Sequence, residues 1–218
     1  AGIGITTYYD NDYPTPLRNT INEEGKLDPP IILYYKGDLA VTRFPGLAVI
    51  GTREITDFGK KAGIFLSQEF AKRGFCIVSG LAVGCDTVGH QGALAVGGKT
   101  IAFLAHGLDS VYPPENADLA QQIVDKVGLL ISEYPMGMGV NRYNLVARDR
   151  LQAGMSLATL VIQTGIKGGT MHAANTTLKA HKPFYVIKFQ KEEQNKNEKS
   201  LGNAALVKKG AKFIAGGN

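Results

Sequence analysis

Cysteine is scarce in this chain, and its placement does not suggest metal binding. The 218 residues include two cysteines, Cys76 and Cys85, with no Cys-x-x-Cys pair and no cysteine–histidine spacing typical of zinc sites. The three histidines at 106, 172 and 181 also lack metal-ligand spacing. We expect both cysteines to act as small apolar residues in a reducing compartment, which favours a cytoplasmic protein.

Long hydrophobic runs are lacking too. No apolar segment approaches the about 20 residues that a membrane-spanning helix needs. Residues 1–13 lack the basic start and the long apolar core of a secretory signal. We therefore expect no membrane partner. Apolar residues still make up 44% of the chain, which is enough to bury a sizeable core.

Several motifs of catalysis and cofactor binding are absent as well. No GxGxxG is followed by an acidic residue about 20 positions later, so a dinucleotide cofactor is not expected. There is no GxxxxGK[ST] phosphate loop and no GxSxG nucleophile turn. The sequence therefore predicts neither a bound cofactor nor a metal.

Positive charge is unevenly distributed. The formal net charge is +5, but residues 179–218 alone carry nine lysines against three glutamates. The rest of the chain has 15 basic and 16 acidic residues. The excess lies within residues 179–218, which include a predicted surface loop at 190–200, so the basic total is weak support for a polyanion partner. Arginines inside motifs are better support.

What is present is a regular alternation of strands and helices. Residues 1–46 are rich in turns and predict an N-terminal extension with a short helix near 15–21 and a strand at 31–36. Residues 47–218 predict a core with strands at 47–50, 75–79, 100–105, 128–132, 158–163 and 183–188, and helices near 57–72, 86–96, 114–126, 144–153 and 170–181. This pattern predicts an α/β fold: a doubly wound, mostly parallel, Rossmann-like sheet with helices on both faces.

The most distinctive stretch runs from Val78 to His90. An apolar strand ends in Ser79-Gly80, a turn of small residues follows to Gly84, and Asp86 is placed to cap the next helix. The backbone N–H groups of such a turn can bind an anion, and glycine allows its close approach. The alternative is a tight strand-to-helix connection in which glycine is needed only for geometry.

Comparable segments follow five of the predicted strands. They span 51–53, 79–90, 106–109, 132–135 and 165–170. Ligands of open α/β sheets bind beyond the carboxyl ends of the strands, so these segments predict a shared binding rim.

Residue types on this rim suit phosphate. Gly168-Gly169-Thr170 opens a helix beside Lys167, and Arg53 can donate two parallel hydrogen bonds to phosphate oxygens. Arg148 and Arg150 diverge by about 200° on a helix. One of them is therefore expected at the rim, and the other is expected to pair with Asp149 or Glu133.

An acid/base group is the competing interpretation of the same rim. Asp86 and His90 are four residues apart on a helix, and Glu133 could join them. We favour the simpler interpretation, in which Asp86 caps the helix and His90 is a packed structural histidine.

Taken in order, the motifs resemble the DNA-processing protein A family, DprA, also called Smf. The resemblance rests on Gly51-Thr52-Arg53, Ser79-Gly80-Leu81-Ala82-Val83-Gly84-Cys85-Asp86 with His90, Gly107-Leu108-Asp109, Tyr112-Pro113-Pro114-Glu115-Asn116 and Ser132-Glu133-Tyr134-Pro135. It covers about residue 13 to the C-terminus. It implies an extended Rossmann fold that binds single-stranded DNA as a homodimer, delivers the strand to the recombinase RecA in natural transformation, and catalyses no reaction.

The resemblance also assigns site residues by position. Basic residues of the family pocket correspond to Arg53, Arg148, Arg150 and Lys167, which would neutralise phosphates without recognising sequence. Tyr134 and Tyr143 could stack on bases, or pack against the rim. Together with the glycine turns, the predicted DNA site comprises Gly51, Thr52, Arg53, Ser79, Gly80, Gly84, Arg148, Arg150, Lys167, Gly168, Gly169 and Thr170.

Two of the departures from the family pattern fall in the predicted site. The usual Arg-Asn-Arg is Arg148-Asp149-Arg150, which puts a negative charge in the predicted site, and the turn after the fifth strand is Gly165-Ile166-Lys167-Gly168-Gly169-Thr170. These departures indicate a divergent branch and leave transformation, phage defence and other DNA pathways open. The turn also resembles that of the "Lonely Guy" nucleotide-processing proteins, so a nucleotide-binding sensor or N-glycosidic hydrolase is the alternative function.

Overall fold

The computed structural model describes residues 2–126 and 128–215, and its centre is a nine-stranded sheet. The strand order is β1-β2-β6-β5-β4-β3-β7-β8-β9. Six of the eight strand pairings are parallel, and the pairings of β2 with β1 and β6 are antiparallel. The strands are β1 (Gly4–Thr7), β2 (Ile32–Gly37), β3 (Gly46–Ile50), β4 (Cys76–Ser79), β5 (Thr100–Leu104), β6 (Leu129–Ser132), β7 (Ser156–Val161), β8 (Phe184–Lys188) and β9 (Lys212–Ala215).

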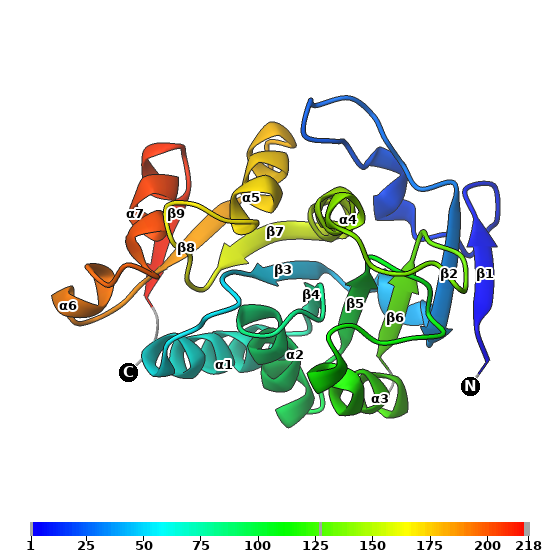
Figure 1. Cartoon of the computed structure of the whole chain (residues 1–218), viewed down its shortest axis with the longest axis horizontal. Helices are drawn as coiled ribbons and strands as arrows, with labels where there is room; N and C mark the ends of the chain where they lie inside the picture. Colours follow the sequence, from blue (N-terminus) through cyan, green and yellow to red (C-terminus); the bar gives the residue numbers. More distant parts are fainter. Residues whose placement is uncertain (1, 127, 216–218) are drawn as a thin grey trace.

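Helices cover both faces of the sheet, as the sequence predicts (Figure 1). On one face lie α1 (Asp57–Lys72), α2 (Cys85–Ala95) and α3 (Ala117–Asp125); on the other lie α4 (Arg142–Met155), α5 (Thr170–Lys179) and α7 (Leu201–Lys208). The short α6 (Glu192–Asn195) follows β8, and 3₁₀ turns occupy Thr15–Asn19, Leu39–Arg43 and Pro114–Asn116.

The central strands are apolar throughout because both of their faces are buried. Along β4, Ile77 packs with the cluster under α1 and α2, whereas Cys76 and Val78 pack with the opposite cluster, which includes Leu151 of α4. All four residues of β4 and all five of β3 are buried. This two-sided burial explains why the sequence shows continuous apolar runs here rather than alternation.

The order of the strands places a switch point beside β3. From β3 the chain moves outward through β4, β5 and β6, then returns to the other side of β3 and continues through β7, β8 and β9. Connections on the two sides of β3 therefore leave in opposite directions, which opens a crevice between the carboxyl ends of β3 and β7.

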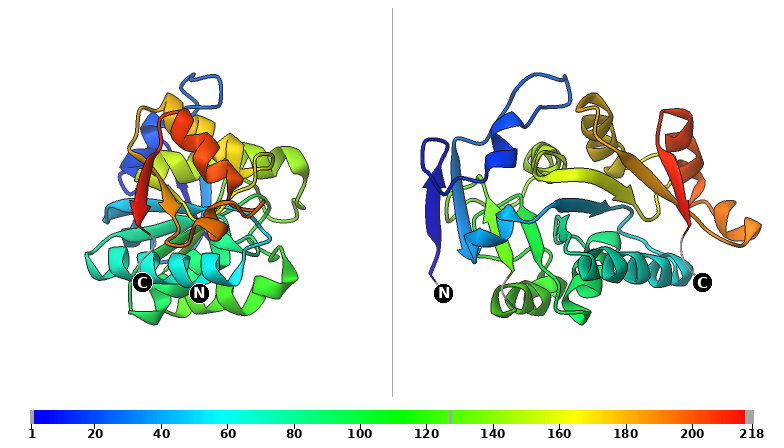
Figure 2. Two further views of the ribbon diagram at one scale, coloured as in Figure 1. Left: turned by 90° about the vertical axis from the view of Figure 1, so that its left-hand side faces the viewer. Right: turned by 180° about the vertical axis from the view of Figure 1, so that it is seen from behind.

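Two ends of the chain differ from the sequence prediction. β1 lies in a segment expected to be irregular, and α7 and β9 follow residue 188, where no element was predicted. β1 and β9 lie at opposite ends of the sheet (Figure 2). Both are four-residue edge strands with exposed positions, so they lack the buried apolar run that marks the central strands.

The N-terminal segment is joined to the core by pairing and packing. β2 pairs with β6, and the fully buried Leu17 packs in the same cluster as Leu151 of α4. The division of the chain after residue 46 stays a prediction. Within the described residues, no helix combines the length and hydropathy that crossing a bilayer requires.

Candidate functional site

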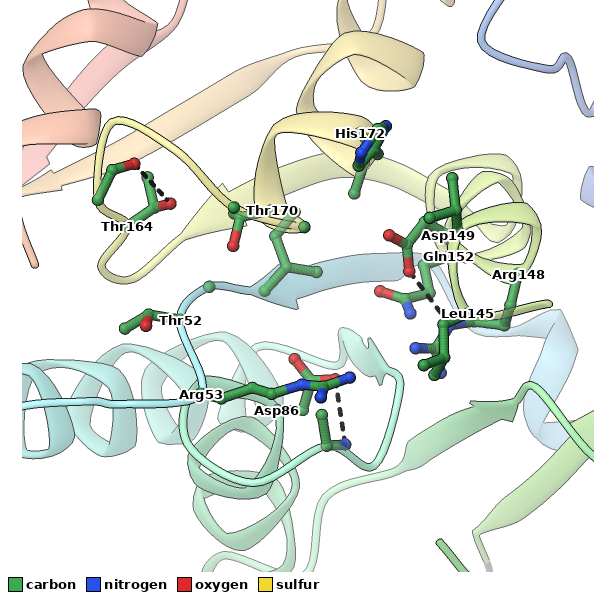
Figure 3. A pocket seen from close by; sticks show the side chains of 18 of the residues that line it. Thr52, Arg53, Asp86, Leu145, Arg148, Asp149, Gln152, Thr164, Thr170 and His172 are labelled. Atoms are coloured by element: carbon green, nitrogen blue, oxygen red, sulfur yellow. Dashed lines mark hydrogen bonds and ion pairs between the residues drawn. The ribbon is translucent and has the colours of Figure 1, made fainter. Parts of the chain in front are cut away.

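A pocket of about 570 Å³ lies at the switch point (Figure 3). Its walls come from the segment after β3, the start of α2, one face of α4 and the turn between β7 and α5. Eight of the twelve predicted site residues line it: Gly51, Thr52, Arg53, Arg148, Lys167, Gly168, Gly169 and Thr170. The rim predicted from the strand ends is thus a real concavity at this point of the sheet.

The segment after β3 is held tightly so that Arg53 can reach the pocket. The N–H of Thr52 donates to Gln163 O at 2.7 Å, and its carbonyl accepts from the N–H of Cys85 at 3.1 Å. A Cβ at Gly51 would lie 2.4 Å from Cys85 Sγ, so glycine is required for this close approach. Arg53 is exposed and points into the pocket (Figure 3), and no carboxylate of the described residues forms an ion pair with it.

The turn before α5 supplies the opposite wall. Helix α5 begins at Thr170 with Gly169 as its N-cap, and Gly168 has a φ of +145°. In the described part of the chain, the N–H groups of residues 168–170 donate to no protein acceptor, and a Cβ at Gly168 or Gly169 would meet no atom within 4 Å. With Lys167 exposed beside them, these N–H groups are open donors at a helix N-terminus, an arrangement that suits an anion.

Arg148 lines the pocket but is mainly engaged with the protein itself. Its side chain is 6% exposed, its Nη1 donates to the carbonyls of Gly80 (2.8 Å) and Phe103, and its Nε donates to Asp149 Oδ1 at 3.2 Å. Among the described residues only Nη2 of this guanidinium lacks a partner. Arg148 therefore joins α4 to the ends of β4 and β5 and has one nitrogen left for a ligand.

Two carboxylates face the same pocket. Asp149 is 17% exposed beside Arg148, and burial raises its pKa to about 6. Asp86 Oδ2 accepts from the N–H groups of Gly80 (3.1 Å) and Ala82 (3.3 Å), and burial raises the pKa of this group as well. The pocket thus combines cationic and anionic groups rather than presenting positive charge alone.

The glycine turn after β4 has a different role from the predicted one. Asp86 is the second residue of α2, whose N-cap is Gly84, and its carboxylate occupies the N–H groups that were expected to bind a ligand. Ser79 Oγ donates to Val49 O at 2.6 Å. A Cβ at Gly80 would lie 2.4 Å from the guanidinium of Arg148, and one at Gly84 would lie 2.4 Å from Thr52 O. Ser79, Gly80 and Gly84 shape the neighbouring walls and do not line the pocket, whereas Asp86 does line it.

Arg150 is the fourth predicted residue that does not line the pocket. Its Nη1 and Nη2 donate to the two oxygens of Glu133, each at 2.6 Å, and its Nε lies 2.7 Å from Asp28 Oδ2. Each of its three guanidinium nitrogens thus has a partner within the protein, and the pairing ties residue 28 to the end of β6. The pairing of one arginine with Glu133 is confirmed, whereas phosphate binding by Arg150 does not fit this placement.

The three groups of the acid/base interpretation do not assemble. His90 is fully buried, its Nδ1 lies 2.7 Å from Thr100 Oγ1, and burial lowers its pKa to about 3. Asp86 and Glu133 are bonded to the glycine turn and to Arg150. His90 is thus the packed histidine that we favoured. The described residues contain no group of three histidine, cysteine or carboxylate side chains that could hold a metal ion.

The segments after β5 and β6 bond to each other instead of lining the pocket. Ser132 Oγ donates to His106 O at 2.8 Å, and both carboxylate oxygens of Asp109 lie 3.0 Å from the N–H of Gly137. Two of the five predicted rim segments therefore contribute support at a distance from the switch point.

Several pocket residues were not predicted from the sequence. Arg142, Leu145 and Gln152 line the pocket from α4 together with Asp149, whose negative charge was expected there, and His172 lines it from α5, where its Nδ1 lies 2.7 Å from Glu23 Oε1. The spacing 142, 145, 149 and 152 follows one face of a helix. Once Arg148 is expected near the rim, this spacing could have identified the other residues of α4 that face the pocket.

The sequence and the fold of this chain are similar to those of known proteins. A family model described as DNA recombination-mediator protein A matches residues 4–218. Protein Smf of Synechocystis sp. is 37% identical over 213 residues, which cover 96% of this chain and 51% of the relative. The chain therefore spans about half the length of that relative.

Two solved structures share the whole fold. The X-ray structure of DNA processing protein A from Streptococcus pneumoniae matches with a TM-score of 0.85 at 30% identity and covers 97% of this chain and 71% of that chain. DNA processing protein A from Helicobacter pylori, studied for its single-stranded DNA binding mode, matches with a TM-score of 0.81 at 31% identity, covering 97% of this chain and 90% of that chain.

Proposed function

Because the chain belongs to the DNA recombination-mediator protein A family, we propose that it binds single-stranded DNA at the switch-point pocket. The observation that carries the proposal concerns the two walls. Among the described residues, Arg53 forms no ion pair on one wall, and the N–H groups of residues 168–170 donate to no protein acceptor on the other. Phosphate oxygens satisfy both kinds of donor at once. The Helicobacter pylori relative, whose structure concerns single-stranded DNA binding, supports the choice of ligand.

The wider role follows from the same proposal. A recombination mediator passes a bound strand onward, so we propose a RecA-type recombinase as the protein partner and a cytoplasmic homodimer as the working form. The proposed function is binding and delivery without catalysis. It is supported by Asp86, His90 and Glu133, each of which is bonded to a structural partner rather than to another member of an acid/base group.

A nucleotide-binding sensor or hydrolase is the second candidate. The volume of about 570 Å³ favours it, because pockets for small ligands measure about 300–1,000 Å³. One nucleotide could be the whole ligand or one unit of a strand, and the walls at Arg53 and residues 168–170 suit the phosphate in both cases.

A titration separates the two candidates. Labelled oligothymidylates of increasing length, a duplex of the same sequence and AMP are titrated against the protein at several salt concentrations. Our proposal predicts affinity that grows with strand length, exceeds that for duplex, and weakens steeply with salt. Saturation by AMP with no gain from a longer strand would favour the sensor, and release of free base from AMP would establish the hydrolase.

A further inference from the structure

One face of α4 forms what we call the floor of the pocket. It differs chemically from the two walls formed by the segment after β3 and by the turn before α5. Helix α4 presents Asp149 and Gln152, which are three residues apart and therefore on the same side of the helix. Figure 3 shows both side chains directed into the pocket. The walls at Arg53 and residues 168–170 offer donors, whereas the floor adds a carboxylate and an amide next to Arg148, which also lines the pocket from α4.

The amide of Gln152 has no partner in the described part of the protein. The residue is only 3% exposed, yet neither its oxygen nor its nitrogen takes part in a hydrogen bond with another group of the described chain. Because Gln152 lines the pocket, its amide is available to a molecule that enters this space. A side chain in this position fits a ligand that offers both a donor and an acceptor.

The carboxylate of Asp149 limits which ligand group can lie on the floor. Its Oδ1 accepts from Arg148 Nε at 3.2 Å, which leaves lone pairs on both oxygens for further donors. A phosphate beside it would be repelled, since both groups are negative. A nucleobase is the part of a nucleotide that carries N–H donors, so the floor suits a base and the walls suit the phosphate.

We propose that Asp149 and Gln152 form a base-recognition subsite that prefers guanine over thymine, a proposal that rests on nucleotide binding at this pocket. Guanine presents two adjacent N–H donors, at N1 and N2, next to the O6 acceptor. The carboxylate of Asp149 accepts from the two donors, and the amide of Gln152 donates to O6. Thymine presents a single N–H between two carbonyl oxygens, and these oxygens would face the carboxylate unfavourably.

The direct test uses one guanine in a uniform strand. Fluorescence anisotropy at pH 8 and fixed salt compares an oligothymidylate with the same strand carrying a central guanine or a central hypoxanthine, which lacks the N2 amino group. The subsite predicts about tenfold tighter binding of the guanine strand, as a bidentate contact provides, and loss of most of that gain with hypoxanthine. Equal affinity for the three strands would overturn the subsite while leaving single-stranded DNA binding intact.

Two substitutions distinguish recognition of the base from the general effect of a negative charge in the pocket. Asp149→Asn should abolish the guanine preference and tighten binding of the uniform strand, because a negative charge leaves the pocket. Gln152→Met should reduce the preference without that general gain. The control is Asp125→Asn, an exposed substitution at the end of α3 that removes the same charge away from the pocket and should change neither quantity. A preference that survives in Asp149→Asn would overturn the assignment.

The same subsite can be measured without a strand. Titration with GMP and TMP tests the base contact even if no oligonucleotide binds, and the subsite predicts tighter binding of GMP. If strands fail to bind but GMP is preferred, the proposed DNA function is wrong and the subsite stands. If neither nucleotide is preferred, the subsite is overturned.

Discussion

Arg148 and Arg150 belong to one turn of α4 but have different partners. Arg148 donates to Gly80 and Phe103 and retains one nitrogen toward the pocket, whereas the guanidinium of Arg150 is held by Glu133 and Asp28. The helical spacing predicts that the two diverge, and this is confirmed. The spacing could not give the partners, because Gly80 is 68 positions from Arg148 in the sequence.

At the residue scale, Asp149 should make stability depend on pH. Its pKa is about 6 in the folded protein and about 4 in an unfolded chain, so the folded state binds more protons between these values. Wild-type folding therefore loses stability as pH rises through this window. Asp149→Asn should be more stable than wild type at pH 8, and this advantage should shrink through pH 6 and vanish near pH 4.

Urea unfolding of both proteins at pH 4, 6 and 8 measures this difference. The isosteric amide can still accept from Arg148 Nε, so the comparison isolates the charge. An advantage that does not change with pH would show that Asp149 is ionised equally in the folded and unfolded states.

At the element scale, the turn between β7 and α5 is the part of the pocket that we propose binds phosphate. Gly169 has a φ of −59°, which proline can adopt, and its Cβ position is open. Gly169→Pro should therefore remove one N–H donor without straining φ. Binding of single-stranded DNA should weaken about tenfold or more, because a hydrogen bond to a charged group contributes about 1.5–3 kcal/mol.

Gly169→Ala is the matched control for this turn. It fills the same open space and keeps the N–H, so its affinity in fluorescence anisotropy should equal that of wild type. Equal weakening by alanine and proline would mean that the shape of the turn matters rather than its donor.

At the scale of the whole molecule, the sheet joins segments that are distant in the chain. Strands β3 to β8 were predictable to within a few residues, because two-sided burial demands apolar runs such as Leu47–Ile50. The edge strands β1 and β9 were not, since they are short and partly exposed. The position of the pocket on the rim was predictable from the sequence. The hydrogen bonds of Asp86 to the glycine turn were not, because they depend on a local conformation that the sequence pattern does not reveal.

Arg150 is predicted to stabilise the molecule without contacting DNA. It links Asp28 in the N-terminal segment to Glu133 after β6, and its side chain is 10% exposed. Arg150→Ala should lower the free energy of unfolding by about 3 kcal/mol, because Glu133 is left without its partner. Folded Arg150→Ala, checked by circular dichroism, should bind single-stranded DNA as wild type does, and a specific loss of affinity would return Arg150 to the binding site.

The most direct test of the central claim is the salt dependence of single-stranded DNA binding by Arg53→Ala. Arg73→Ala is the control, because Arg73 is 62% exposed just beyond the far end of α1 and pairs with Glu69 outside the pocket. Binding of DNA at the switch-point pocket predicts that Arg53→Ala weakens binding about tenfold or more. It also predicts that the slope of log K against log salt falls in magnitude by about 0.7, which corresponds to one phosphate contact on a single strand. Unchanged affinity and slope in Arg53→Ala, or equal losses in both variants, would contradict the placement of DNA at the switch-point pocket.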